Sequence, residues 1–250
     1  MDYILVCPTY KRIKTLKNKT LSLLTRTNAP LPELWINVDE DIALYSLEFP
    51  DYIIHQAGTD IGTKRNAIQD YYPVGSRIVF IDDDIKDIVV KEGNKKRSII
   101  DFNKMVEFCF TNAELYKSKI WGLYPIANPL FMKNIFRQKL CYIIASCFGL
   151  INTRFSVKSN YAEDVERSLL YYKDQSLLFR VDFIGIYTNY YKEPGGLQET
   201  RTEQKNYDSK KLLAEEYSEF CKLAEKRGRA EIIYNRTKNK NIEYQETLDF

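Results

Sequence analysis

Arg77-Ile78-Val79-Phe80-Ile81-Asp82-Asp83-Asp84-Ile85, residues 77–85, is an apolar run that ends in three consecutive carboxylates. Its apolar part, 78–81, is typical of a fully buried strand in a parallel sheet. Three carboxylates follow at the end of that strand. Open α/β sheets form their ligand crevice at the carboxyl ends of their strands. The stretch therefore predicts an α/β fold with a site beside residues 82–84.

The acidic triplet also predicts a metal site. Adjacent carboxylates repel one another and are costly to remove from water. A divalent cation offsets that cost, and Mg²⁺ and Mn²⁺ favour oxygen ligands. Because alternate side chains of a strand point to the same side, Asp82 and Asp84 could share one cation while Asp83 points away. The alternative is an acidic turn that is merely solvated.

The composition suits a single α/β domain. The chain has 250 residues, of which 44% are hydrophobic and 28% are charged. The net charge of +3 is compatible with a polyanionic partner but does not require one. The five cysteines lack metal-ligand spacing and are expected to be reduced and mostly buried. With no signal-peptide pattern at the start and no apolar run long enough to span a bilayer, we expect a cytoplasmic protein without a membrane partner, in the host cytoplasm if it is viral.

Strands that alternate with helices imply a right-handed, mostly parallel sheet. In the first part of the chain we expect strands at 3–7, 34–39, 51–55 and 77–81, helices at 13–27 and 64–72, and a loop at 58–62. After an exposed loop at 92–97, we expect helices at 101–117, 164–173 and 208–226, strand-like stretches at 122–127, 141–150 and 177–187, and a polar tail that is peripheral or frayed.

Polar residues follow the first two predicted strands. Residues 8–12 read Pro-Thr-Tyr-Lys-Arg, and their amides and hydroxyls could hold a base and a ribose. Asp39 ends the second strand, where its carboxylate could accept from a base N–H or a ribose hydroxyl. Ordinary turn chemistry explains the first segment as well, and a solvated strand end is as good an interpretation of Asp39.

Residues 58–66 read Gly-Thr-Asp-Ile-Gly-Thr-Lys-Arg-Asn. The glycines allow a tight turn, and Thr63 could cap the following helix. Lys64 and Arg65 would then lie in its first turn, where the helix dipole disfavours cations. Basic residues placed against this preference suggest an anionic partner, either a diphosphate or the acidic triplet. The spacing does not match a P-loop.

Two later segments contain further candidates. Glu163 and Asp164 lie at a helix start, either as capping acids or, in a crevice, as a general base. The loop Pro194-Gly195-Gly196-Leu197, followed by Arg201, could close over phosphates, and an ordinary turn explains it equally well. The single histidine, His55, is expected to be a core or strand-end residue and not a ligand.

Taken together, these motifs resemble those of the GT-A glycosyltransferases. The matching parts are residues 8–12, Gly62 to Asn66, Asp82-Asp83-Asp84 and Glu163-Asp164, within roughly residues 3–200. In that family an Asp-x-Asp motif holds Mn²⁺ or Mg²⁺ on the diphosphate of a nucleotide sugar, and a later Glu-Asp supplies the base of inverting members. The resemblance implies a GT-A fold: a mostly parallel Rossmann-like sheet flanked by helices, with a smaller mixed sheet on the acceptor side.

The resemblance also implies roles for individual residues. Asp82 and Asp84 would bind the metal, and Asp164, beside Glu163, would be the catalytic base. It implies a nucleotide-sugar half at about 1–100, an acceptor half at about 101–230 and a polar tail at 231–250, within one domain. The donor, expected to be a UDP-sugar, would contact Pro8, Thr9, Tyr10, Arg12, Asp39, Gly62, Lys64, Arg65, Asn66, Asp82, Asp83, Gly196 and Arg201.

Within the family, the chain looks most like the small glycosyltransferases associated with base-oxidising enzymes of the TET and JBP type. These modify hydroxymethylated pyrimidines in phage and kinetoplastid DNA. The match implies a double-stranded DNA acceptor whose target base is extruded, and a monomer or weak homodimer. The expected phosphate contacts are Lys95-Lys96-Arg97, Lys133, Arg137 and the pair Arg227/Arg229.

The chain departs from the GT-A pattern in two places. The Gln-x-x-Arg-Trp signature of processive synthases is absent, and no histidine follows the triplet as a further metal ligand. Three alternatives therefore stay open: a transferase with a glycan or small-molecule acceptor, a nucleotidyltransferase, which typically uses two metals, and a non-catalytic module that binds nucleotide sugars or nucleic acid.

Overall fold

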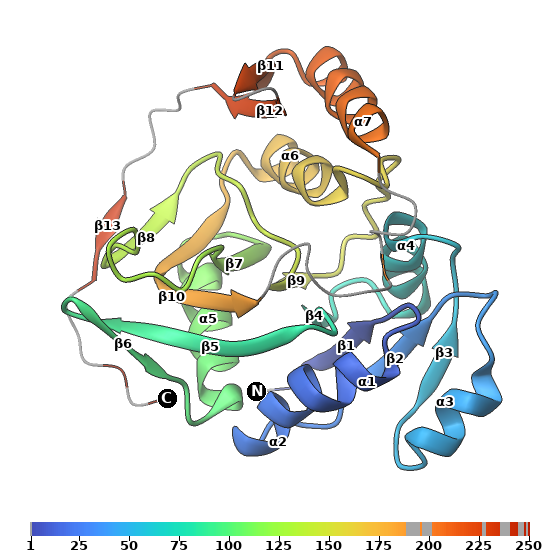
Figure 1. Cartoon of the computed structure of the whole chain (residues 1–250). Coiled ribbons are helices and arrows are strands. Elements are labelled where there is room, and N and C mark those ends of the chain that lie inside the picture. The colour runs from blue at the N-terminus through green and yellow to red at the C-terminus, as the bar shows by residue number, and fades with distance from the viewer. Residues whose placement is uncertain are drawn as a thin grey trace.

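The computed structural model describes residues 2–188, 196, 202–226, 229–235, 241–244, 248 and 250. In these residues, helices flank a central sheet, and a two-stranded sheet lies apart from it (Figure 1). The strands are β1 (Ile4–Pro8), β2 (Glu33–Ile36), β3 (Ile54–Gln56), β4 (Arg77–Ile81), β5 (Ile85–Glu92), β6 (Lys95–Ser98), β7 (Ile120–Tyr124), β8 (Ile135–Gln138), β9 (Cys147–Ile151), β10 (Phe179–Thr188), β11 (Cys221–Lys226), β12 (Arg229–Tyr234) and β13 (Ile242–Glu243). The helices are α1 (Ile13–Leu16), the π-helical turn η1 (Lys17–Leu21), α2 (Ser22–Arg26), α3 (Ile42–Glu48), α4 (Ile61–Tyr71), α5 (Phe102–Leu115), α6 (Glu163–Gln175) and α7 (Glu203–Glu216).

The first half of the sheet is parallel, as the alternation of strands and helices predicts. Strand β1 pairs in parallel with β2 and β4, and β2 pairs in parallel with β3. Their carboxyl ends therefore meet at one edge of the sheet, which brings Thr9 next to the acidic triplet: Thr9 Oγ1 donates to Asp83 Oδ2 at 2.7 Å. This is the contact between segments that the sequence placed at two separate strand ends.

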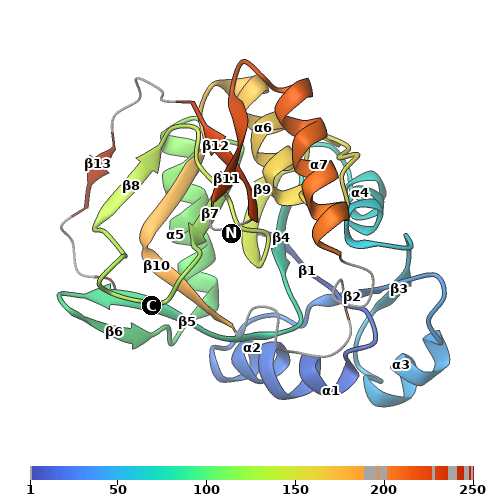
Figure 2. The same ribbon diagram turned by 45° about the horizontal axis from the view of Figure 1, so that its top comes forward.

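The mixed strands expected on the acceptor side continue the same sheet. Strand β9 is antiparallel to both β4 and β7. Strand β10 runs parallel to β7 and antiparallel to β5 and β8. The full order is β13-β8-β10-β7-β9-β4-β1-β2-β3, with β5 and β6 branching from β10. The separate two-stranded sheet, β11–β12, packs with α7. Together they lie above α6 in Figure 1, and the two strands lie in front of α6 in Figure 2.

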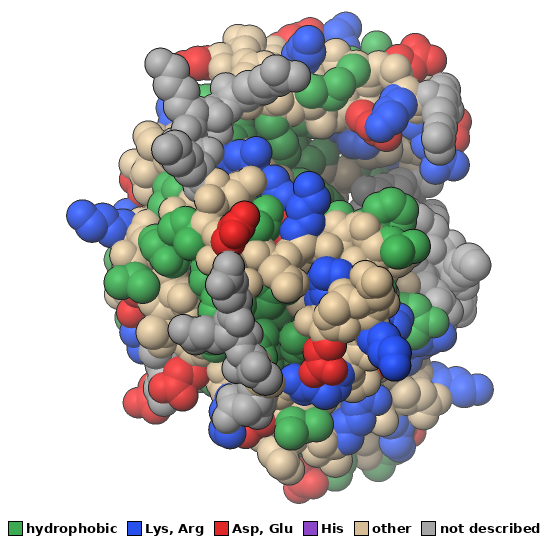
Figure 3. All heavy atoms as spheres, turned by 90° about the vertical axis from the view of Figure 1, so that its left-hand side faces the viewer, with side chains coloured by type: hydrophobic (Ala, Val, Ile, Leu, Met, Phe, Trp, Pro, Cys, Tyr) green, Lys and Arg blue, Asp and Glu red, His purple; other side chains and the backbone are tan. Residues whose placement is uncertain are grey.

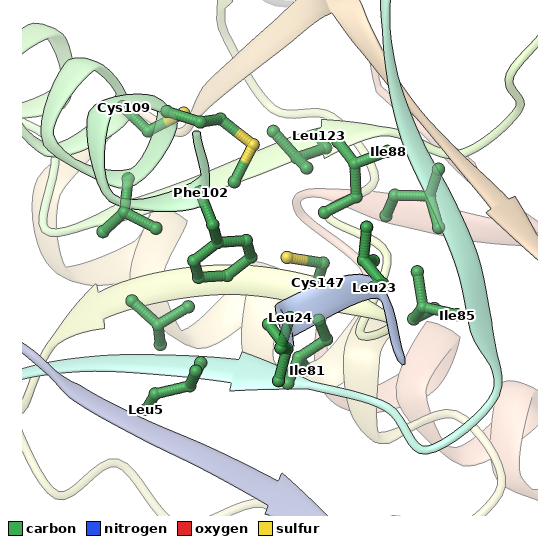
Figure 4. Close-up of a cluster of buried hydrophobic side chains, with 14 of the residues drawn as sticks. Leu5, Leu23, Leu24, Ile81, Ile85, Ile88, Phe102, Cys109, Leu123 and Cys147 are labelled. Carbon is green, nitrogen blue, oxygen red and sulfur yellow. The ribbon is translucent and has the colours of Figure 1, made fainter. Parts of the chain in front are cut away.

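Both faces of the sheet are buried, which explains the near-continuous apolar strands. Alternate residues of β1 and β4 belong to two different clusters: Leu5 and Ile81 pack toward α2 and α5, whereas Val6, Ile78 and Phe80 pack toward α4 and α6. Figure 4 shows the first cluster, where Phe102 and Cys109 of α5 approach Leu5, Ile81 and Cys147 of the sheet. Each large apolar side chain buried in this way contributes about 1.5–3 kcal/mol.

Several predicted boundaries are wrong. The helix after the 58–62 loop begins at Ile61, because Asp60 is the N-cap and Thr63 completes its capping box. The predicted loop at 92–97 is a β-hairpin between β5 and β6, with Gly93 in the left-handed region at φ +58°. The predicted helix at 208–226 is α7 followed by strand β11. Helix α3 and strand β5 were not predicted.

The cysteines, the histidine and the C-terminal tail were also the subject of predictions. All five cysteines are free and buried. His55 lies on β3, stacks on Trp35 at 4.3 Å and contacts Glu33, away from the acidic triplet. The tail is not wholly frayed, because β13 pairs with β8 and Phe250 is buried. No helix in the described part of the chain has the length and apolar character needed to cross a membrane.

Candidate active site

A cleft of about 780 Å³ opens where β1 and β4 end. Its volume lies in the range that small-molecule and cofactor sites occupy. One wall carries Pro8, Thr9, Tyr10, Arg12, Asn37, Lys64, Arg65 and the acidic triplet, and the other carries Tyr142, Asn160, Tyr161, Glu163, Asp164, Asn206, Lys210, Glu231, Ile232 and Tyr234. Most of the predicted site residues are therefore brought together in one cavity.

The three acids of the triplet point in different directions. Asp83 is buried and accepts from Thr9 Oγ1 at 2.7 Å and from Arg12 Nη1 at 3.0 Å. Asp82 and Asp84 keep 30% and 15% of their side chains exposed. Asp83 thus anchors the triplet to the loop after β1, while Asp82 and Asp84 remain available at the cleft.

Burial raises the pKa of both outer carboxylates, Asp82 and Asp84. It raises the pKa of Asp82 to about 7, although Arg65 acts in the opposite direction. Burial, and then the neighbouring Asp83, also raise the pKa of Asp84. A cation at this position would restore the charge balance, because it favours the ionised carboxylates.

Asp82 and Asp84 fit a cation that arrives together with a diphosphate. Within the described residues, no group of three or more His, Cys, Asp or Glu side chains is arranged to hold a metal. Magnesium sites, however, often use one or two carboxylates and take their remaining ligands from substrate phosphates and water. The two carboxylates could supply the protein ligands of such a site, and the chemistry of their oxygen donors suits Mg²⁺ or Mn²⁺.

Thr20 holds the backbone of the triplet in place. Its hydroxyl donates to the carbonyl of Asp82 at 2.6 Å and accepts from the amide of Ile85 at 3.0 Å. Thr20 lies in the π-helical turn between α1 and α2, and such turns occur frequently at functional sites. The sequence predicted an uninterrupted helix here and gave no signal for this contact.

Arg65 connects the triplet to the opposite wall. Its guanidinium is buried and donates to Asp82 Oδ1 at 2.6 Å, to the carbonyl of Ala145 at 2.9 Å, and to Glu163. The sequence suggested either a diphosphate or the acidic triplet as the anionic partner of Lys64 and Arg65, and Arg65 contacts the acidic triplet. Helix α4 therefore positions a cation that links Asp82 to the start of α6.

Lys64 forms the floor of the cleft. It is 2% exposed, and its Nζ donates to the carbonyl of Thr9 at 2.5 Å. Burial lowers the pKa of Lys64 to about 8, and the nearby acids Glu40 and Asp83 oppose that change only in part. The residue fastens α4 to the loop after β1 and places a positive charge beneath it.

Three predicted donor contacts lie outside the cleft lining. Asn66 fixes a loop that ends at α6: its Nδ2 donates to the carbonyl of Val157 at 2.8 Å, and its Oδ1 accepts from the amide of Val157 at 3.0 Å. A Cβ on Gly62 would lie 2.7 Å from Asn160 Oδ1, so glycine allows this loop to touch α4. Asp39 accepts from Tyr10 Oη at 3.1 Å.

Gly196 returns to the first loop from far along the chain. Its φ is +68°, its amide donates to the carbonyl of Tyr10 at 3.1 Å, and a Cβ would lie 2.7 Å from Arg12 Cζ. Only a glycine allows this close approach without strain. Arg201, the other residue predicted in this segment, lies outside the described residues.

The two acids at the start of α6 have different surroundings. Glu163 is buried and contacts Arg65 and, at 3.5 Å, Arg167. Asp164 lines the cleft and accepts from Tyr142 Oη and from the amide of Val165. Burial, followed by the charge of Glu163, raises the pKa of Asp164. Asp164 is therefore the acid of the pair that is placed to exchange a proton with a bound molecule.

Sequence reasoning missed most of the second wall. Tyr142 lies in an irregular segment that was read as strand, and Asn206 and Lys210 lie on α7. Glu231 and Tyr234 lie on β12, within the stretch read as a polar tail. These residues have no spacing that marks a site, because only the packing of α7 and β12 against α6 brings them to the cleft.

Two solved structures are similar to this chain at low sequence identity. Glucosyl-3-phosphoglycerate synthase from Mycobacterium tuberculosis, in a complex with Mn²⁺, UDP and glucosyl-3-phosphoglycerate, is 9% identical and superposes with a TM-score of 0.51 over 96% of this chain and 89% of that one. A putative nucleotide-diphospho-sugar transferase from Desulfovibrio desulfuricans G20 is 12% identical, with a TM-score of 0.40 over 72% and 80% of the two chains. No family model and no curated protein matches the chain. The likeness to the synthase confirms the predicted fold class, an α/β fold of the GT-A type.

Proposed function

We propose that the chain is a metal-dependent, inverting glycosyltransferase that uses a UDP-sugar. One observation carries the proposal: a single cleft holds Thr9 at the end of β1, Asp82 and Asp84 after β4, and Asp164 at the start of α6. These are a strand-end loop for a nucleotide, two oxygen ligands for a cation and a candidate base. The shared fold with a synthase whose structure contains Mn²⁺ and UDP supports the donor assignment.

The donor would lie along the first wall. Thr9, Tyr10 and Asn37 offer polar groups to the base and ribose, and Arg12 lies beside Asp84 at 3.4 Å, where a diphosphate would approach. Asp82 and Asp84 would hold the Mn²⁺ or Mg²⁺. A cation bound there would supply Lewis-acid stabilisation of the departing diphosphate. Arg12 and the buried Lys64 add positive charge on the same side.

Asp164 would act as the general base. Its carboxylate removes the proton of an acceptor hydroxyl, the hydroxyl oxygen forms a bond to the anomeric carbon, and the bond from that carbon to the diphosphate breaks, so that UDP leaves with the bonding electrons. A raised pKa suits this task, because a base works best with a pKa near the working pH. Glu163 is occupied by Arg65 and Arg167 and would hold the start of the helix.

The acceptor proposed first is a hydroxymethyl pyrimidine in DNA. Tyr142, Tyr161 and Tyr234 line the second wall and offer aromatic faces to an extruded base. The DNA backbone would need cations near the cleft. Of those named from the sequence, Lys95, Lys96, Lys133 and Arg229 are exposed, and Arg227 lies outside the described residues.

The internal contacts of three of the cations named from the sequence favour a second candidate, a glycan or small-molecule acceptor. Arg97 donates to the carbonyls of Leu248 and Phe250, Lys96 donates to the carbonyl of Ala127, and Arg137 pairs with Asp182. On the face shown in Figure 3, Lys and Arg side chains are interspersed with acidic and apolar ones. Neutralising phosphates with these residues would first require that their internal bonds break.

Release of UDP from a panel of UDP-sugars, with and without Mn²⁺, tests the proposed chemistry. We expect metal-dependent release that rises when an acceptor is added. No release from any UDP-sugar, with any acceptor, would contradict it. A gel-shift titration on hydroxymethylated duplex DNA then separates the acceptors: binding that weakens steeply with salt supports DNA, and no binding at low salt supports a glycan or small molecule.

A further inference from the structure

A buried ionic network on β8 and β10 has no part in the proposed chemistry. Asp182 is fully buried and accepts from Arg180 Nε at 2.7 Å and from Arg137 Nε at 2.8 Å. Arg180 is also buried. Buried ion pairs rarely add to stability, because apolar residues of similar size often do as well or better. The network therefore calls for a role other than holding the sheet together.

The network ends on the backbone of Tyr142. Arg180 Nη1, on the far side of the guanidinium from Asp182, donates to the carbonyl of Tyr142 at 2.8 Å. The segment from 139 to 146 contains no helix or strand between β8 and β9, so it has no ladder of its own to fix it. Three further hydrogen bonds hold the segment: the amide of Ile143 donates to Ser168 Oγ of α6 at 3.3 Å, Arg65 of α4 donates to the carbonyl of Ala145 at 2.9 Å, and the amide of Asp82 donates to the carbonyl of Ser146 at 2.8 Å. Of these contacts, only the one from Arg180 is made to Tyr142 itself.

The side chain of Tyr142 then reaches the candidate base. Its hydroxyl donates to Asp164 Oδ2, while the amide of Val165 donates to Oδ1 at 2.9 Å. Both carboxylate oxygens therefore have a donor, and the plane of the carboxylate is fixed. Tyr142 and Asp164 both line the cleft, so this contact lies where a substrate would bind.

We infer that Tyr142 is a positioning residue for Asp164, and that the Arg137–Asp182–Arg180 network holds Tyr142 in place for this purpose. The inference rests on the role of Asp164 as base in the proposed function. A base must lie within hydrogen-bond reach of the proton that it removes, and a displacement of about 1 Å can reduce a rate about 100-fold. The network supplies this accuracy to a segment that regular secondary structure does not hold.

The charged groups around Asp164 fix the sign of the expected change. Glu163 on the same helix and burial raise the pKa of Asp164, whereas the hydrogen bond from Tyr142 and the charge of Arg65 on α4 lower it. Tyr234 on β12 also faces it. Removing the hydroxyl of Tyr142 takes away one of the lowering influences, so the pKa of Asp164 should rise.

The test is Tyr142→Phe, with Tyr72→Phe as the matched control. Tyr72 also donates to a carboxylate, Glu33, at 2.5 Å, but lies outside the cleft lining. The titration of Asp164 is followed by carbon-13 NMR of the aspartate carboxyls, assigned with Asp164→Asn. We expect its midpoint to move to higher pH in Tyr142→Phe and to stay unchanged in Tyr72→Phe. An unchanged midpoint in Tyr142→Phe would overturn the inference.

Kinetics and binding supply the second readout. With UDP-glucose and Mn²⁺, we expect UDP release by Tyr142→Phe to fall at least about 10-fold, its acid limb to move to higher pH, and UDP affinity to stay within about 2-fold. Arg180→Lys, which keeps a charge for Asp182 but loses the planar fork, should move the midpoint of Asp164 in the same direction. An unchanged titration midpoint of Asp164 in Arg180→Lys would show that the network does not position Tyr142. Failure of UDP to bind at all would contradict the proposed function, while the NMR titration would still decide the Tyr142–Asp164 contact.

Discussion

Replacing Lys64 with methionine should change how the stability of the protein depends on pH. Lys64 is 2% exposed, and burial lowers its pKa from 10.5 to about 8. In the unfolded chain its pKa returns to the usual value. Between pH 8 and pH 10.5 the unfolded state therefore binds more protons than the folded state, and stability rises with pH across this window. Below pH 8 both states are protonated and the full cost of burying the charge remains.

The magnitude follows from the two pKa values. One pKa unit corresponds to about 1.4 kcal/mol, so the buried charge costs about 3 kcal/mol at pH 7. Lys64→Met removes the titration, along with the hydrogen bond to the Thr9 carbonyl. The loss of that bond is a nearly constant offset. The difference in unfolding free energy, wild type minus Lys64→Met, should therefore grow by about 3 kcal/mol from pH 7 to pH 10.5.

Urea unfolding at a series of pH values between 7 and 10.5 measures this difference. All other titrating groups are common to the two proteins and cancel. The matched control is Lys17→Met, whose side chain is 60% exposed beside Glu48 and should give a difference that stays flat. A flat difference for Lys64→Met as well would refute the assignment of a buried charge at the cleft floor. The same variant should bind UDP about 10-fold more weakly, because a cation beneath the diphosphate has been removed.

Three further changes test other parts of the site. Asp164→Asn should leave UDP affinity nearly intact while transfer, measured as UDP release, falls at least about 100-fold. Turnover equal to that of the wild type would show that Asp164 only caps the start of its helix. Asn66→Ala should cost about 1–3 kcal/mol in urea unfolding, because the amide and carbonyl of Val157 lose their partner; a cost within the error of the measurement would show that the loop is held by other contacts. Gly196→Ala should weaken UDP binding in calorimetry, because a Cβ at φ +68° would displace Arg12, and unchanged affinity would place this contact outside the donor site.

The parallel half of the fold could be predicted because burial on both faces leaves its mark on the sequence. Residues 78–81 are apolar without alternation, and the next residues are acids. This pattern is typical of a central strand that ends at a ligand crevice. Local patterning was enough for this strand. It was not enough for the acids, because β4 ends at Ile81 and a turn, not the alternation of strand residues, buries Asp83 against Thr9.

Other parts of the structure depend on contacts that no local pattern encodes. Thr20 reaches the triplet through a π-helical turn that looks like ordinary helix in sequence. Residues 221–226 read Cys-Lys-Leu-Ala-Glu-Lys, which is compatible with either a helix or a strand, and only their pairing with β12 makes them a strand. Arg97 was expected to contact DNA phosphates from an exposed loop, yet it donates to two carbonyls near the end of the chain. In each case the partner is distant in sequence.

Binding of UDP with and without Mn²⁺, measured by calorimetry for the wild type and Asp84→Asn, tests whether the acidic triplet binds the donor through a metal ion. Asp87→Asn is the matched control, because Asp87 lies three residues away, pairs with Arg26 at 2.5 Å and is outside the cleft lining. We predict that Mn²⁺ strengthens UDP binding in the wild type and in Asp87→Asn, and that Asp84→Asn loses this gain while its unfolding curve stays cooperative. Equal UDP affinity in all three proteins, with or without Mn²⁺, would contradict a metal-dependent donor site at the acidic triplet.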